Sequence, residues 1–179
     1  MERIGDWMTT YTGRQFWPLD PRPEDVCIED IAHALSMICR FGGHCRKFYS
    51  VAQHSCYVAS LIPGPEKDGT SLAALMHDAA EAYVGDLIRP IKRSFTPYHQ
   101  VEAKVDAAIR QRFGLACIPE IIKWADNAML KNEHRDMIDD GMTWEVDAGD
   151  YPRIDVIPIQ PGDAESLFLW AFRRYGGTV

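Results

Sequence analysis

Apolar residues recur every three or four positions along most of the chain, which is the spacing of a helix with one buried face. This pattern predicts helices over residues 25–40, 50–62, 70–85, 98–113, 119–138 and 163–175. Two stretches lack the pattern, and there we expect short β-hairpin pieces: one near the N-terminus, in residues 9–22, and one around residues 143–159, where RIDVIPI could form a strand. The pattern therefore predicts an all-α fold, a compact helical bundle.

Local signals define several of the helix ends. Ser50 followed by Gln53 matches a capping box, in which the serine caps the helix that it opens. Pro119 suits the first turn of a helix. Gly114 suits the left-handed residue that closes one. These signals agree with the apolar periodicity about where the helices begin and end.

The predicted helix over residues 70–85 carries an unusual polar face. His77, Asp78 and Glu81 gather on one side of it, and no Lys or Arg occurs between Thr70 and Ile88. A solvated face usually mixes both signs of charge. A bound metal ion would supply the missing positive charge. The alternative is that His77 caps the helix or lies on the surface and that the two acids are solvated.

Two further residues bear on this choice. Asp126 projects between Ile122 and Met137, inside the apolar stripe of its predicted helix. A buried carboxylate without a partner costs several kcal/mol, so it needs either a metal or an ion pair. His54 lies among apolar neighbours near the start of the preceding helix, and alone it would be interpreted as structural.

Together, His54, His77, Asp78 and Asp126 form a sensible ligand set for one divalent ion. Imidazole suits Zn, Mn, Fe, Co or Ni, and carboxylates extend the choice to Mg. Four protein ligands on an octahedral ion leave positions open for water and substrate. Glu81, one turn beyond His77, could then take a proton from the attacking water.

Composition and charge narrow the kinds of partner. The 179 residues suffice for a single domain spanning 1–179, and the net charge of −7 disfavours a nucleic acid polymer as partner. An anionic ligand should be small and met by a local cluster of cations, such as Arg40, Arg46 and Lys47. The five cysteines form no CxxC pair and are expected to be reduced thiols. With no signal peptide and no long apolar run, we expect a cytoplasmic protein without a membrane partner.

The ordered residues His54, His77-Asp78 and Asp126 resemble the H…HD…D signature of the HD-domain metal-dependent phosphohydrolases. The segment HDAAEAYVGDLIRPIK is most similar to the small 5′-deoxynucleotidases and phage dATP triphosphohydrolases within that superfamily. The resemblance implies a helical HD-domain bundle, a catalytic Glu81, and substrate contacts from Arg40, Phe41, Asp86 and Lys92. The family often has Trp where this chain has Phe41.

The resemblance implies metal-dependent hydrolysis of the 5′-phosphoester of a (deoxy)nucleotide, releasing nucleoside and phosphate, or triphosphate from a dNTP such as dATP. Residues 77–81 read HDAAE rather than HDxGK, which excludes a cyclic-dinucleotide phosphodiesterase of the HD-GYP type. One alternative is a catalytically inactive metal- or nucleotide-binding module of the same fold. Another is a helical adaptor whose polar residues are incidental. The number of protomers is open, and a homo-oligomer is allowed.

Overall fold

A computed structural model describes residues 2–64, 69–115 and 120–178. Within these ranges the chain is mainly helical, so the prediction of an all-α fold is confirmed. The only strands described form a small antiparallel hairpin near the N-terminus, with Met8 paired to Phe16 and Thr9 to Gln15. The elements in order are β1 (Met8–Thr9), β2 (Gln15–Phe16), η1 (Pro23–Asp25), α1 (Ile28–Met37), η2 (Arg40–Gly43), α2 (Val51–Ser60), α3 (Thr70–Leu75), α4 (Glu81–Val84), α5 (Arg89–Lys92), α6 (Thr96–Phe113), α7 (Glu120–Glu133), η3 (His134–Ile138) and α8 (Pro161–Arg174).

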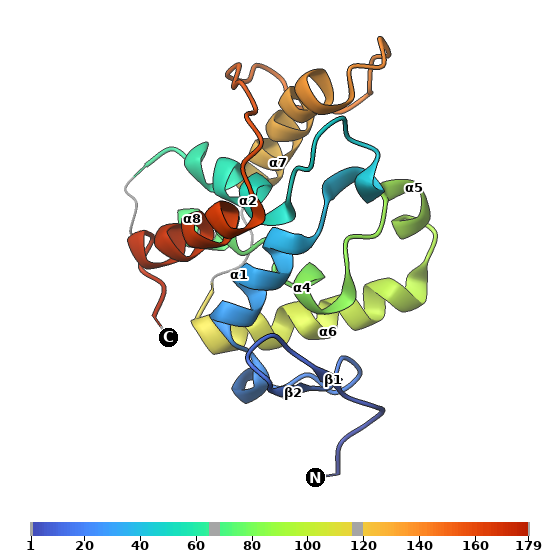
Figure 1. Ribbon diagram of the computed structural model, residues 1–179, viewed down its shortest axis with the longest axis vertical. Helices are drawn as coiled ribbons and strands as arrows, with labels where there is room; N and C mark the ends of the chain where they lie inside the picture. Colours follow the sequence, from blue (N-terminus) through green and yellow to red (C-terminus); the bar gives the residue numbers. More distant parts are fainter. Residues whose placement is uncertain (1, 65–68, 116–119, 179) are drawn as a thin grey trace.

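The hydrophobic core lies where α1, α2 and α8 pack together, with α3 and α7 against them. Figure 1 shows α1 passing through the middle of the molecule, with α6 running beneath α4 and the hairpin at the end opposite α7. The largest fully buried apolar side chains come from β2, α1, α3, α6, α7, α8 and the segment before α2, and they include Phe16, Ile31, Leu35, Tyr49, Leu75, Ile109, Met129, Phe168 and Phe172. Burial of these apolar surfaces is the main stabilising contribution to the fold.

The predicted single helix over residues 70–85 is wrong, because the chain leaves helical geometry after Leu75 and resumes it at Glu81. The ring Nδ1 of His77 donates to the carbonyl of Ala74 at 2.8 Å. A continuous helix would give that carbonyl to the N–H of Asp78. In the turns between the two helices, backbone N–H groups donate to the carbonyl three residues earlier rather than four. His77 and Asp78 therefore lie in the turn that joins α3 to α4.

The first helix also ends earlier than predicted. Helix α1 stops at Met37, and Ile38 and Cys39 are extended. The carbonyl of Ile38 accepts from the N–H of Val51, and the N–H of Arg40 donates to the carbonyl of Tyr49. This local pairing pulls the chain out of the helix and places Arg40 at the start of the 3-10 turn η2.

The strand expected around 143–159 is also wrong, because the described chain there is irregular. Side chains replace the missing strand partner. Asn132 accepts from the N–H of Ile154 at 3.0 Å, and Asp136 accepts from the N–H of Val156 at 2.8 Å. Gln53 donates to the carbonyl of Ile157 and accepts from the N–H of Ile159. The backbone polar groups are thus satisfied without a sheet.

The cap signals are mostly confirmed. Ser50 accepts a hydrogen bond from the N–H of Gln53, while the side chain of Gln53 reaches the 157–159 segment rather than back to Ser50. Gly114 closes α6 in the left-handed conformation, with φ of 62°. Pro119 lies outside the described residues. None of the described helices is both long and apolar enough to cross a membrane.

Candidate metal centre

Three of the four predicted metal ligands meet in one place. His54 comes from α2, and His77 and Asp78 come from the turn between α3 and α4. One ligand atom from each of the three lies within 4.8 Å of the others. Among the described residues this group could hold a metal ion, and the donor set of two imidazoles and a carboxylate suits a divalent ion of the first transition row.

Both imidazoles direct Nε2 toward the carboxylate of Asp78. The Nδ1 of His77 is occupied by the carbonyl of Ala74, and the Nδ1 of His54 contacts Glu133. Both Nε2 atoms are buried and have no hydrogen-bond partner. A buried polar atom without a partner is costly, so two of them beside one carboxylate fit a bound cation. The Oδ2 of Asp78 lies 3.1 Å from Nε2 of His77 and 3.7 Å from Nε2 of His54.

The short distances between the imidazoles and the carboxylate shift the pKa values of His77 and Asp78. Burial disfavours the charged form of His77, but the adjacent Asp78 outweighs it and raises the pKa of His77 to about 9. Burial likewise disfavours ionised Asp78, yet His77, His54 and Arg40 lower its pKa far below the usual range. A proton on His77 therefore balances part of the carboxylate charge, and a bound cation would replace it.

Asp126 on α7 lies beside the group, and it has the ion pair that the sequence left open as the alternative to a metal. Its side chain is 23% exposed, and its Oδ2 is 3.2 Å from the guanidinium of Arg89. Its Oδ1 lies 3.3 Å from Nε2 of His54, within reach of the same centre. Burial opposes ionisation of Asp126, but the adjacent imidazole of His54 and the charge of His77 lower its pKa to about 2.

A cavity of about 790 Å³ adjoins the group at the carboxylate of Asp78. Asp78 and Asp126 line it, and so do all the residues predicted to act on substrate: Arg40, Phe41, Glu81, Asp86 and Lys92. The cavity also contains Arg89, Arg93 and Trp144, which the sequence had not indicated. Acidic and cationic side chains therefore line one shared cavity beside the candidate ligands.

Glu81 begins α4 and is almost fully buried. Burial raises its pKa well above the usual value, and the charges of Asp78 and Asp86 raise it further. Its Oε1 lies 3.3 Å from the ammonium of Lys92, while its Oε2 has no hydrogen-bond partner. Lys92 is held in turn by Glu102 at 2.6 Å. Glu81 is thus a buried carboxyl with a raised pKa and one oxygen that has no hydrogen-bond partner, features that are common among proton-transfer groups.

Arg40 and Phe41 lie on the turn η2 at the cavity wall. The guanidinium of Arg40 is largely buried and lies 3.1 Å from Glu133 and 3.8 Å from Asp78. Phe41 has φ of 58° and ψ of 27°, a left-handed conformation that a bulky residue rarely adopts. Strain of this kind is found where the surrounding structure, or a function, requires it.

Comparison with known proteins identifies the family. No family model matches the chain. The chain is 41% identical over 170 residues to YfdR of Escherichia coli strain K12, an uncharacterized protein, and the alignment covers 93% of both chains. This chain belongs to the YfdR family. An uncharacterized protein of Rhodobacter capsulatus is also 41% identical, over 130 residues that cover 68% of this chain and 66% of that protein.

One residue important to the site of this YfdR-family chain escaped the sequence analysis. Glu133, the last residue of α7, is fully buried and contacts His54, Arg40 and Tyr49. A signal for it exists, because Glu133 follows Asp126 by seven positions and two helical turns return to the same face. Arg89 and Trp144 offered no such signal, since neither lies on a face shared with a ligand.

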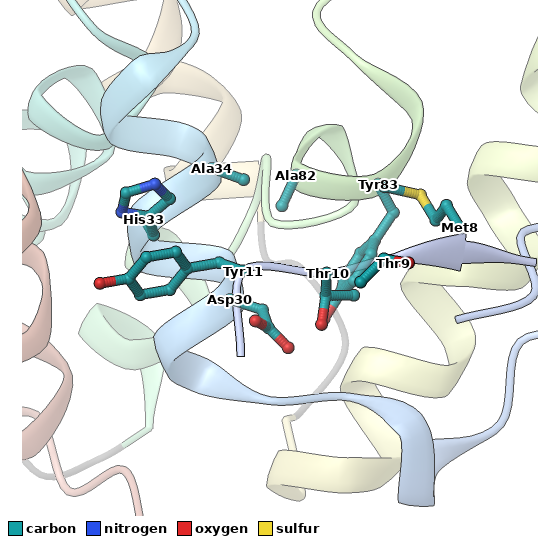
Figure 2. A pocket seen from close by; sticks show the side chains of 9 residues that line it. All are labelled: Met8, Thr9, Thr10, Tyr11, Asp30, His33, Ala34, Ala82 and Tyr83. Atoms are coloured by element: carbon teal, nitrogen blue, oxygen red, sulfur yellow. The ribbon is translucent and has the colours of Figure 1, made fainter. Parts of the chain in front are cut away.

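A second, smaller cavity of about 290 Å³ lies against the N-terminal hairpin (Figure 2). Its polar groups are already paired. Asp30 accepts from the N–H and the hydroxyl of Thr12. His33 lies 3.0 Å from Glu165, and the ring of Tyr11 stacks on it at 3.7 Å between centroids. None of the described residues that line it has an unpaired buried polar atom, so the larger cavity is the better candidate site.

Proposed function

We propose that this protein is a metal-dependent phosphohydrolase that cleaves the 5′-phosphoester of small nucleotides. One observation carries the proposal: the buried Nε2 atoms of His54 and His77 have no hydrogen-bond partner and lie beside Asp78, next to a cavity lined by several cations. The resemblance to the HD-domain phosphohydrolases supports the same reaction. Asp126 completes the proposed ligand set, in competition with its ion pair to Arg89.

A divalent ion held by these residues would polarise a phosphoryl oxygen and lower the pKa of a nearby water. The chain itself supplies the other requirements. Arg40 offers a planar pair of donors for phosphate oxygens, and Lys92 adds a point charge. Lys92 forms ion pairs with Glu81 and Glu102 and lines the same cavity.

Glu81 is proposed to accept the proton of the attacking water. Its free Oε2 and its raised pKa suit a group that takes up a proton during turnover and releases it afterwards. Glu81→Gln keeps the size of the side chain and should retain metal while turnover falls by about 10² or more. Glu165→Gln, outside the cavity, serves as the control and should match the wild type.

We propose a preference for deoxynucleotides, with a 5′-monophosphate as the default substrate and dATP as the main alternative. The ring of Phe41 beside Arg40 would crowd a 2′-hydroxyl, and Asp86 could accept a hydrogen bond from the 3′-hydroxyl. Both side chains line the cavity, which supports contact with the same sugar. The alternative for Phe41 is a packing role alone, since its ring also packs against the core.

A substrate panel tests the proposal. Ribo- and deoxynucleoside mono-, di- and triphosphates would each be incubated with Mn, Co, Zn and Mg, and both phosphate and triphosphate release would be measured. We expect turnover of deoxynucleotides that a chelator abolishes and added metal restores. Metal binding without turnover of any nucleotide would favour the alternative, a catalytically inactive binding module.

A further inference from the structure

Glu133 is a buried acid that the proposed reaction does not use directly. Its exposed fraction is 0%, and it lies at the end of α7, where the π-helical turn η3 begins. One oxygen, Oε1, contacts Nδ1 of His54 at 2.5 Å and accepts from the hydroxyl of Tyr49 at 2.8 Å. The other, Oε2, is 3.1 Å from the guanidinium of Arg40. A single carboxylate therefore touches both a candidate metal ligand and the candidate phosphate-binding arginine.

We propose that Glu133 is a positioning residue that fixes His54 for metal binding and holds Arg40 at the cavity wall. The inference rests on the metal site of the proposed function. An ionised carboxylate only accepts hydrogen bonds, so the proton of the neutral His54 ring must be on Nδ1. The lone pair is then on Nε2, the atom that faces Asp78 and Asp126. Such a carboxylate also makes the imidazole a stronger ligand.

The burial of Glu133 explains why an acid is required there. An ionised carboxylate without partners would be costly in this position, and the charge of Arg40 and the donors of His54 and Tyr49 offset that cost. An amide in the same place would turn its NH₂ group toward at least one of these donors. The arrangement therefore needs the charge as well as the shape of the side chain.

The experiment compares metal affinity in wild type, Glu133→Gln and Glu165→Gln, using equilibrium dialysis with Mn²⁺ and, separately, Co²⁺. Loss of a carboxylate behind a ligating histidine typically weakens metal binding 10- to 100-fold, and we expect that range for Glu133→Gln. Glu165→Gln is the matched control, because it removes the carboxylate of another His–Glu pair, outside the cavity. Its metal affinity should equal that of the wild type.

A merely structural Glu133 would give a different result. It would lower the thermal midpoint of the variant but leave the metal affinity of the folded protein unchanged, which would overturn the inference. At saturating metal, Glu133→Gln should also raise the KM for nucleotide by about fivefold, since Arg40 loses one of its two ion-pair partners. An unchanged KM would overturn the part of the inference that concerns Arg40.

A measurement on the wild type keeps the test valid if the variant does not fold. In the zinc-loaded protein, long-range ¹H–¹⁵N spectra should show the His54 proton on Nδ1. A proton on Nε2 would refute the proposed orientation. The two proposals fail separately: absence of metal from the wild type would reject the metal site itself, whereas equal affinity in wild type and Glu133→Gln would reject only the role of Glu133.

Discussion

Phe41 permits a sharp test of whether the strained turn η2 serves substrate binding or packing. Its ring is half-buried, with the ring of Trp144 at 5.9 Å between centroids and the guanidinium carbon of Arg40 at 5.4 Å. The informative pair of variants is Phe41→Ala and Phe41→Gly. Both remove the ring, but only glycine also relieves the left-handed backbone.

The expected magnitudes follow from burial and conformation. Removing a half-buried ring should lower the free energy of unfolding by about 1.5 kcal/mol, against about 3–5 kcal/mol for a core phenylalanine. The left-handed conformation costs a residue with a side chain about 1–2 kcal/mol. Glycine regains this but loses about 0.4–1 kcal/mol to the entropy of the unfolded chain. Phe41→Gly should therefore be more stable than Phe41→Ala by about 0.5–1 kcal/mol.

Urea denaturation would measure the stabilities, and steady-state kinetics would measure KM for matched deoxy- and ribonucleotides. Both variants should show a higher KM and a smaller preference for the deoxy substrate. A loss of 3 kcal/mol or more in Phe41→Ala would assign the ring to packing. Unchanged KM and sugar preference in both variants would remove Phe41 from the substrate site, and a less stable glycine variant would refute the argument from strain.

Three other predictions concern metal and stability. Asp126→Ala should lose metal and activity together, and full metal content by elemental analysis would reject its role as a ligand. Metal uptake at pH 7 should release protons, because the pKa of His77 is about 9 and its imidazolium must lose a proton to bind metal. The metal affinity should therefore rise with pH up to about pH 9. Calorimetry in buffers of different ionisation enthalpy measures the released protons, and detecting none would contradict the prediction. Asn132→Ala should lower the unfolding free energy by about 2–3 kcal/mol, because it leaves the N–H of Ile154 unpaired. The control Asn127→Ala removes one exposed bond and should cost about 0.5 kcal/mol by urea denaturation, so equal losses would contradict the argument.

The sequence alone determined most of the helices and which residue types gather at the site. Apolar periodicity and caps such as Ser50 and Gly114 are local signals, and each depends on residues within a few positions. The cation-free polar face that carries His77 and Asp78, together with Asp126 inside an apolar stripe, indicated a metal centre. Signals of this kind can be recognised in a sequence because the apolar spacing repeats along each helix.

Tertiary structure decided the details that local signals cannot carry. The helix breaks at His77, where the imidazole ring donates a hydrogen bond to the backbone carbonyl of Ala74. The 143–159 segment lacks a strand because the side chains of Gln53, Asn132 and Asp136 form hydrogen bonds with its backbone. Glu133 reaches His54 across 79 positions of sequence. Burial makes such long-range polar contacts strong, yet the sequence does not reveal which distant groups will meet, because the packing of the helices decides it.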